Sequence, residues 1–573
     1  MRSFLRAAVT GATIGAVGLG SAWGAAVIST PSLPPVPPAV ASTVGGNATP
    51  AKADPAAQPA PLSATVPGER LAAGWFLAGS ATTTLVPPAD KVKSKAECQK
   101  AAGQSTLYTP LTPEGCLITF DGLWMDGVDE ANPISARSIA LSNGSDTVVF
   151  TLMDVVGYMA AYPASLCADC GIDAITKSLS TKLGIPAQNL QVSSSHTHAA
   201  PSTIANGAAW YYKYVRDQLK LSIEGAVADL KNSPQVRLET GATSAKAFNV
   251  DRRIQNRAVP DYEMAWLRAF VPSSTTTVDA PGKKNDGETT TPERTVATVG
   301  NFAVHPTIRN ANARLHSGMV GPFTRRVSEV LGGASLFLPG ALGDQTPDKS
   351  FGINGIGIGL ADALLDDVER GGYVLQTNDI AVARTTVQVP IENQFFVAAL
   401  GVGYAVRDFL PPYGGGPHAV ATENEGTNLR SCAGAGALHV VTPISAIRFG
   451  AKPPTGKQNL GPEYQVPVET DNVVVVQSPG EIFASIGLIV KDYLSRSNNV
   501  LVQGVTNDTI GYIIPANQYD LFASQGLGLA NNAAEIGNYE EALSLGKCTG
   551  EIVTNAMLDM GKQLGVMGEG EGR

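Results

Sequence analysis

The sequence is poor in charged residues and in histidine, and it has no excess of basic residues. Charged residues make up 16% of its 573 residues, against roughly 25% in a typical soluble domain. The 41 Lys and Arg are outnumbered by 50 Asp and Glu, which gives a formal net charge of -9. This balance argues against a nucleic-acid-binding protein, which usually carries a basic patch or stripe. Apolar residues reach 44%, so a chain disordered along its whole length is excluded.

Beyond the N-terminus, no continuous apolar stretch approaches the length of a transmembrane helix, and the sequence contains no internal repeat. Residues 1–30 carry Arg2 and Arg6, followed by an uncharged run and small residues, a pattern typical of a secretory signal peptide. A signal anchor is the alternative, because the run is long enough to span a bilayer. In both cases we expect an exported protein, either secreted or associated with the cell envelope.

Residues 31–69 are expected to form a disordered linker rich in proline and alanine. Within it, residues 31–67 hold ten of the 38 prolines. Such a composition cannot bury enough apolar surface to fold and is typical of an extended tether. We therefore expect one catalytic domain over residues 70–573.

The six cysteines favour disulfides, because their number is even and the chain is expected to be exported. Cys167 and Cys170 form a CxxC, which zinc sites and redox pairs also use. No second CxxC is present, and the surrounding sequence is not thioredoxin-like, so we expect a structural disulfide. Of the fifteen pairings open to six cysteines, Cys98–Cys116 and Cys432–Cys548 then follow by elimination only.

Apolar β-rich runs alternate with helix-like segments along the folded part of the chain. This alternation predicts an α/β fold with a mixed or parallel sheet and flanking helices. The strands we expect cover residues 146–153, 189–193, 295–304, 334–337, 472–476 and 500–505. The helices we expect cover residues 170–183, 209–230, 324–331, a segment after 356, 482–494 and a segment from about 551. Residues 273–294 and 410–432 are interpreted as long exposed loops.

Residues able to bind a metal collect at the ends of these strands, although the chain has only six histidines. His196 and His198 follow one strand and, on extended backbone, face the same side. His305 follows another strand, which Pro306 helps to end. Glu481 follows a third and is expected to open a helix. Because ligands of open α/β sheets bind beyond the carboxyl ends of strands, we expect these groups to meet there.

Two histidines and one carboxylate are typical of a catalytic zinc site that keeps an open position. Zinc held in this way generates hydroxide near neutral pH and polarises a carbonyl. The separations, 109 residues from His196 to His305 and 176 from His305 to Glu481, exclude a zinc finger. The alternative is that each histidine satisfies a local hydrogen bond and that Glu481 only caps its helix.

Three further residues lie in neighbouring segments. Gly343–Pro347 contains glycine, aspartate and proline, residue types that favour turns. Within it we expect Asp344 to orient a ligand imidazole and Thr346 to offer a hydroxyl to a reacting carbonyl; an ordinary turn is the alternative. Tyr512, considered alone, is interpreted as a core residue.

Five short motifs, SSSHTHAAP, NFAVHPT, GDQTPD, SPGE and TNDTIGYI, follow one another along the chain. As an ordered set they resemble the neutral/alkaline (non-lysosomal) ceramidase family, and the resemblance covers most of residues 75–565. It implies a zinc amidase with an α/β catalytic domain that cleaves the N-acyl bond of ceramide. It also implies one zinc ion per chain, held by His196, His305, Glu481 and Tyr512. His198 is then the general acid or oxyanion stabiliser, and Arg252 contacts substrate, with the register between Arg252 and Arg253 left open.

The chain departs from the family pattern in three places. The family's Gly-Asp-Val-Ser-Pro-Asn is Gly-Asp-Gln-Thr-Pro-Asp here, so Thr346 replaces the catalytic serine and adds a methyl group that stiffens χ1. Ala199-Ala200-Pro201 replaces Ser-Gly-Pro-Gly-Gly, which we expect to reshape the substrate entrance. We expect no C-terminal immunoglobulin-like domain, because the chain ends near the point where larger members begin theirs.

The leading hypothesis is therefore an exported zinc-dependent amidohydrolase that acts on ceramide or a related lipid amide. It has a lipid-like substrate, contact with a membrane surface and no nucleic-acid partner; the oligomeric state is not predicted. Water activated by zinc, or Thr346, attacks the carbonyl, while zinc and His198 stabilise the oxyanion. A second hypothesis is a zinc esterase or amidase with a non-sphingoid envelope substrate. A third is a non-catalytic envelope binding protein of the same fold, for which four zinc ligands would not be required.

Overall fold

The computed structural model describes residues 68–102, 112–205, 207–253, 259–277, 288–308, 314–393, 438–452, 472–495, 498–519 and 539–566. The expected signal or anchor (1–30), nearly all of the expected linker (31–69) and the expected loop at 410–432 lie outside these residues. None of the helices in the described ranges is both long and apolar enough to cross a membrane.

The largest element of the fold is a nine-stranded sheet with the order β11-β10-β7-β5-β1-β2-β3-β4, in which β13 also pairs with β5. The pairs β3–β4 and β10–β11 are parallel, and the others along this order are antiparallel. The strands are β1 Phe76–Thr84, β2 Ser135–Ser142, β3 Thr147–Met153, β4 Leu190–Ser194, β5 Gln235–Ser244, β7 Glu263–Val271, β10 Arg294–Phe302, β11 Ala334–Pro339 and β13 Tyr373–Val374. The sheet is therefore mixed, as the alternating pattern predicted.

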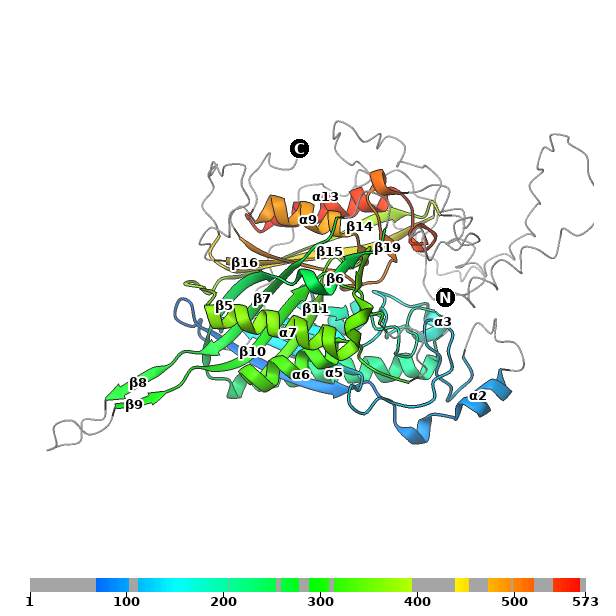
Figure 1. Ribbon diagram of the computed structural model, residues 1–573, viewed down its shortest axis with the longest axis horizontal. Helices are drawn as coiled ribbons and strands as arrows, with labels where there is room; N and C mark the ends of the chain where they lie inside the picture. The colour runs from blue at the N-terminus through cyan, green and yellow to red at the C-terminus, as the bar shows by residue number, and fades with distance from the viewer. Residues whose placement is uncertain are drawn as a thin grey trace, which may run out of the picture.

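A second, four-stranded sheet has the order β14-β15-β16-β18, and its β16–β18 pair is parallel. Its strands are β14 Ile380–Pro390, β15 His439–Gly450, β16 Asn472–Gln477 and β18 Asn499–Gln503. Helices α9 (Ala484–Leu494) and α13 (Thr549–Gln563) cover one side of this sheet, and the large sheet lies on its other side (Figure 1). The two sheets and the covering helices thus form stacked layers.

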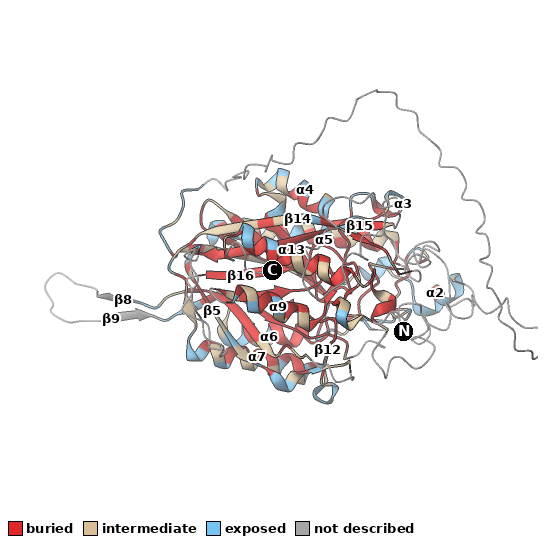
Figure 2. Ribbon diagram, turned by 90° about the horizontal axis from the view of Figure 1, so that it is seen from above, coloured by how far each residue is buried: buried red, intermediate tan, exposed pale blue. Residues whose placement is uncertain are grey.

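The remaining helices are α2 Lys95–Ala101, α3 Ala164–Cys167, α4 Ile172–Leu183, α5 Ala209–Asp229, α6 Val320–Leu331 and α7 Gly352–Arg370. Most of them flank the large sheet, whereas α2 lies apart from it at the periphery (Figure 1). Helix α5 packs on β1 and β2, and α6 and α7 pack against each other and against β11, β5 and β7. Figure 2 shows buried residues concentrated in the strands, with exposed residues on the outer sides of these helices.

The main hydrophobic core joins both sheets, which explains why the central strands are apolar on both faces. Every residue of β3 and of β16 is buried. Phe150 of β3 contacts Phe449 of β15, with ring centroids 6.1 Å apart. A strand covered on both sides reads as a continuous apolar run rather than as an alternation, and these two runs were the clearest strand signals in the sequence.

Three short strand pairs lie outside the sheets: β6 (Asn249–Asp251) with β12 (Gln345–Pro347), β17 (Glu481–Ile482) with β19 (Tyr512–Ile513), and β8 (Ser274–Thr277) with β9 (Glu288–Thr291). The last pair lies in the stretch 273–294, which we expected to be a loop. That expectation is wrong at both ends of the stretch, where threonine-rich segments form an antiparallel ladder that projects from the body (Figure 1). Threonine is β-branched and favours strands.

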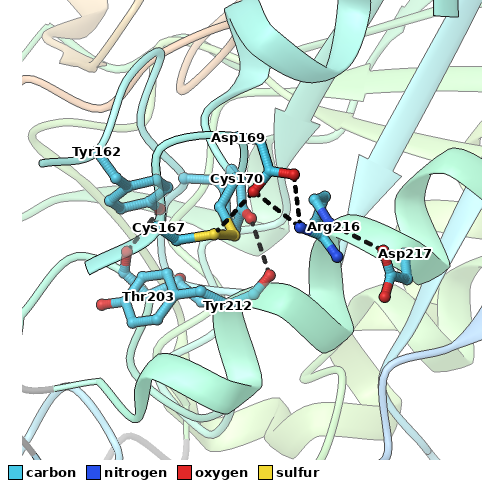
Figure 3. The surroundings of a disulfide bond; sticks show 9 residues. Tyr162, Cys167, Asp169, Cys170, Thr203, Tyr212, Arg216 and Asp217 are labelled. Carbon is cyan, nitrogen blue, oxygen red and sulfur yellow. Dashed lines mark hydrogen bonds and ion pairs between the residues drawn. A yellow bond between two sulfur atoms is a disulfide. The ribbon is translucent and has the colours of Figure 1, made fainter. Parts of the chain in front are cut away.

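The expected disulfides Cys98–Cys116 and Cys167–Cys170 are both present. Cys548 is also disulfide-bonded, and Cys432, its expected partner, lies outside the described residues. Figure 3 shows the CxxC disulfide beside α5, where Arg216 Nη1 donates to both carboxylate oxygens of Asp169 at 2.8 Å. The Cys167–Cys170 disulfide therefore links the last residue of α3 to the short loop that precedes α4.

Candidate metal centre and catalytic site

Three buried side chains from distant parts of the chain meet at one point. His196 follows β4, His305 follows β10, and Glu481 lies in β17 beyond the end of β16. Oε2 of Glu481 is 3.3 Å from His196 Nε2 and 3.0 Å from His305 Nε2. One ligand atom from each residue lies within 4.8 Å of the others, close enough to hold a metal ion. The sequence prediction that strand-end histidines and Glu481 converge is confirmed.

Main-chain carbonyls orient both imidazoles. His196 Nδ1 donates to the carbonyl of Val156, and His305 Nδ1 donates to the carbonyl of Gln345 at 3.0 Å. Each ring therefore presents Nε2 to the cluster. Histidines that bind metals usually donate their other ring N–H to a carbonyl or carboxylate, so the donor set fits a metal ion such as zinc.

The expected role of Asp344 in orienting an imidazole is wrong, because carbonyls already occupy both Nδ1 positions. Asp344 Oδ1 instead accepts from the main-chain N–H of Ala484 at 2.8 Å and from Gln345 Nε2 at 3.0 Å. Asp344 thus caps the first turn of α9. Glu481 was expected to open this helix, but α9 begins three residues later, at Ala484.

The electrostatics of the cluster favour the protonation states that bind a cation. Burial, together with the positive charge of Arg252, lowers the pKa of His305 to about 3. Burial alone raises the pKa of Glu481, but His196 and His305 outweigh it and hold that pKa well below its usual range. A neutral imidazole and an ionised carboxylate are the forms that coordinate metals.

Tyr512 lies beside this trio. It pairs with Glu481 in the β17–β19 ladder, and its ring centroid is 6.2 Å from that of His305. Its hydroxyl accepts from Arg252 Nη2 at 3.1 Å and lies 3.3 Å from the hydroxyl of Tyr539. The phenol oxygen is therefore held at the edge of the metal-ligand cluster, while the ring packs in a small hydrophobic cluster with Phe483 and Ile514, as the interpretation of Tyr512 as a core residue expects.

The two neighbouring arginines, Arg252 and Arg253, have different partners. Arg252 reaches the site, where Nη2 also donates to the carbonyl of Gly343 at 2.6 Å and Nε donates to Glu540 at 2.9 Å. Arg253 instead donates to Glu541 and to the carbonyl of Gln518. Arg252 is therefore the arginine beside Tyr512, and its guanidinium is fixed on three sides.

Tyr539 and Glu540 are site residues that the sequence analysis missed. The adjacent pair Glu540-Glu541 matches the adjacent pair Arg252-Arg253, with each arginine bound to a carboxylate. These pairs lie almost 290 residues apart in sequence. The only signals were an arginine doublet and a glutamate doublet, and no local pattern joins them, because the chain carries other doublets of both charges.

His198 lies on the other side of His196, with ring centroids 5.1 Å apart. Its Nδ1 is 3.4 Å from Oδ2 of Asp121, and its side chain is 12% exposed. Both ring nitrogens are buried, and neither makes a hydrogen bond to a residue in the described ranges. His198 therefore presents a buried Nε2, with no hydrogen-bond partner among the described residues, next to the candidate metal ligands.

Thr346 lies in β12, directly after the residue whose carbonyl anchors His305. It pairs with Val250 of β6 and is partly exposed. Within the described part of the chain, its hydroxyl makes no hydrogen bond to a histidine. The structure thus places Thr346 in the segment next to His305 without linking it to a base.

The backbone around the cluster is unusual at three places. His196, Val505 and Asn507 are the non-glycine residues with positive φ among those described, at 64°, 48° and 61°. Ser194 N donates to the carbonyl of Val505 at 3.1 Å, and Asn507 N donates to that of Val192 at 2.7 Å. The loop after β18 is thereby fastened to β4 immediately before His196.

A second group with metal-ligand spacing, Cys167, Asp169 and Cys170, does not form a metal site in this structure. Both thiols are consumed by the disulfide between them. The histidine cluster is therefore the metal-site candidate supported by its donor set.

Comparison with known proteins gives the fold a precedent. Two solved structures, a neutral ceramidase from Pseudomonas aeruginosa and a ceramidase complexed with C2, are each 15% identical to this chain. Each aligns with a TM-score of 0.53 over 85% of this chain and 74% of the solved one. The fold is ceramidase-like. No family model matches the sequence, and no curated protein matches it, so the chemistry has to be argued from the site.

Proposed function

We propose that the protein is an exported, zinc-dependent, ceramidase-like amidohydrolase that cleaves the N-acyl bond of ceramide or a related lipid amide. The convergence of His196, His305 and Glu481 at one buried point is the observation that carries this proposal. Two imidazoles and a carboxylate are the ligand set of catalytic zinc sites with an open position. The ceramidase-like fold supports a lipid amide as the substrate class.

Zinc, when bound, supplies a Lewis acid that lowers the pKa of water and polarises a carbonyl oxygen. His196, His305 and Glu481 would hold it, with the hydroxyl of Tyr512 as a further oxygen ligand. Arg252 keeps that hydroxyl in place through its hydrogen bond of 3.1 Å. The ligands are thus oriented by the protein before a metal binds.

His198 is the residue that we assign to proton transfer. Its Nε2 is buried and makes no hydrogen bond to the described residues, so it can donate to the developing oxyanion or to the leaving amine. Thr346 would bind the reacting carbonyl through its hydroxyl or serve as the nucleophile. Buried surroundings strengthen such hydrogen bonds, because water competes less well there.

A second candidate is a zinc esterase or amidase with a non-sphingoid substrate. Ala199 and Ala200, which follow His198, are each only 1% exposed. They stand where the family motif has serine and glycine, and Thr346 carries a methyl group where the family has serine. These departures from the family motif favour a substrate other than ceramide.

Metal content and substrate preference test both candidates. We expect the purified full chain to contain about one zinc per chain, held by the histidine cluster found in the described part of the chain. We also expect kcat/KM for N-acylsphingosine to be at least about tenfold higher than for a short acyl ester, a difference of about 1.4 kcal/mol in transition-state binding. Mass spectrometry and product chromatography provide the measurements. Zinc with turnover of the ester alone would favour the second candidate, and a chain that binds no zinc would overturn both.

A further inference from the structure

We infer that Asp121 is a positioning residue that orients His198 for catalysis, an inference that rests on the proposed function of the site. Asp121 Oδ2 lies 3.4 Å from His198 Nδ1, and the two side chains are 8% and 12% exposed. Nothing in the sequence around Asp121 indicated a site. The assignment comes from the loop that carries Asp121, from its attachment and from the needs of the His198 ring.

The loop is a tight hairpin with a defined tip. Thr119 N donates to the carbonyl of Leu123 at 2.9 Å, and Gly122 N donates to that of Thr119 at 3.0 Å. Gly122 has a φ of 80°, which a residue with a Cβ rarely adopts. Phe120 and Asp121 therefore occupy the two central positions of a β-turn, where the backbone restricts the direction of their side chains.

The hairpin is fastened to the chain just beyond His198. Ser202 N donates to the carbonyl of Ile118 at 2.8 Å, and Thr119 forms a β-bridge with Pro201. Cys116, which begins the hairpin, is held by its disulfide to Cys98. The position of Asp121 relative to His198 is therefore set by main-chain bonds and does not depend on a chance meeting of two long side chains.

The His198 ring needs such a partner. Buried polar atoms are almost always hydrogen-bonded, yet neither ring nitrogen of His198 makes a hydrogen bond to a described residue. Asp121 is placed to accept a hydrogen bond from Nδ1 of His198. The Phe120 ring makes a T-shaped contact with the imidazole at a centroid distance of 5.4 Å. Catalytic hydrogen bonds are often long in the free enzyme and tighten when substrate binds. With Nδ1 turned to Asp121, Nε2 is left for the substrate.

The two neighbouring histidines are thus anchored differently. His196, a candidate metal ligand, donates its Nδ1 proton to a main-chain carbonyl, whereas His198 faces a carboxylate. A charge-assisted hydrogen bond to a carboxylate is about twice as strong as one to a neutral acceptor. The carboxylate of Asp121, the stronger acceptor, therefore orients His198, which has no metal bond to fix its ring.

The test compares Asp121→Asn with wild type. We expect kcat to fall about 100-fold, the size of effect associated with a misplaced acid or base. We expect KM to change less than about threefold and zinc content to stay the same, because Asp121 faces His198, which is not one of the proposed metal ligands. Asp126→Asn is the matched control, since Asp126 lies on the same segment but is exposed and paired with Lys95; it should retain full kcat.

A double variant separates positioning from a purely structural role. If Asp121 acts only through His198, Asp121→Asn combined with His198→Ala is no slower than His198→Ala alone. Additive losses, or a lower zinc content in Asp121→Asn, would instead assign Asp121 to the support of the loop and overturn the inference.

A spectroscopic readout keeps this test independent of activity. In metal-free protein we expect a downfield imidazole N–H proton resonance that disappears in His198→Ala and shifts in Asp121→Asn. An unchanged resonance in Asp121→Asn would overturn the contact between Asp121 and His198. If wild type binds zinc but hydrolyses none of the substrates, the proposed function fails, and the resonance still decides the contact.

Discussion

Replacing His305 by alanine is expected to release the metal ion and to lower amide hydrolysis by at least about a thousandfold. His305 Nε2 lies 3.0 Å from Glu481, and its removal leaves the candidate site with one imidazole and one carboxylate. Lewis-acid catalysis supplies several kcal/mol, and each 1.36 kcal/mol is about a tenfold change in rate. Zinc per chain and kcat/KM for the amide substrate are the quantities to measure.

A matched control for this substitution is His439→Ala. His439 is also buried, at 8% exposure, but it begins β15 and lies outside the ligand cluster. The His439→Ala variant should keep its zinc and most of its activity. Zinc that binds the native state alone also raises the melting temperature, so added zinc should stabilise His439→Ala but not His305→Ala. Full zinc content and full activity in His305→Ala would show that the metal assignment is wrong.

Replacing Asp261 by alanine is expected to lower the free energy of unfolding by about 3 kcal/mol, the lower end of the range for breaking a buried ion pair. Lys491 Nζ of α9 lies 2.8 Å from Asp261 Oδ2 and 3.0 Å from Glu263 Oε1. Asp261 is 3% exposed, whereas Glu263 is 43% exposed. Without Asp261, the buried ammonium of Lys491 keeps only the partly solvated partner, which is why we expect a large loss. Urea unfolding monitored by circular dichroism measures it.

The same ion pair has a defined pH dependence. Burial alone lowers the pKa of Lys491, but Asp261 and Glu263 outweigh it and raise that pKa above its usual value. A raised folded-state pKa means that the stabilisation is fully present below the ordinary lysine pKa of about 10.4 and is lost as pH rises through the folded value. The stability difference between wild type and Asp261→Ala should therefore stay constant between about pH 6 and 9 and shrink in stronger alkali.

Glu263→Ala is the control for this pair. Because Glu263 is exposed, it should cost no more than about 1 kcal/mol. If the two substitutions destabilised the protein equally, the buried contact with Asp261 could not be the reason for the loss.

The predictable parts of the fold are the strands and helices whose own sequence shows a clear apolar run or helical pattern. The buried runs of β3 and β16 and the long helix α5 were found near their observed bounds. β2 and β5 were missed, because their sequences, SARSIALS and QVRLETGATS, contain many small or polar residues. The hydroxyl of Ser138 in β2 bonds to Thr151 of β3 and Ser222 of α5. Such a strand is stabilised by partners that a local pattern does not contain.

The candidate site also contains residues that the sequence could predict and residues that it could not. His196, His305 and Glu481 were predictable, because each carries metal-binding chemistry just beyond the carboxyl end of an apolar strand. Tyr512 required the resemblance to a family, since a buried tyrosine alone is ordinary. Asp121 was beyond reach because its contact with His198 depends on the hairpin and its attachment at Pro201. Asp344 was misjudged because main-chain carbonyls, which every residue possesses, took the role assigned to its carboxylate.

The left-handed backbone at His196, Val505 and Asn507 has a consequence for the evolution and engineering of this protein. A non-glycine residue in that region costs about 1–3 kcal/mol, and a β-branched residue such as Val505 is especially unfavourable there. Asn507→Gly would relieve part of this strain, yet it would remove the side chain that accepts from Val192 N at 3.0 Å and would loosen the turn leading into His196. Thermostable variants selected without an activity screen would be expected to gain part of their stability at this loop and to become slower enzymes. We therefore expect relief of this strain to raise the melting temperature and to disturb the position of the His196 imidazole.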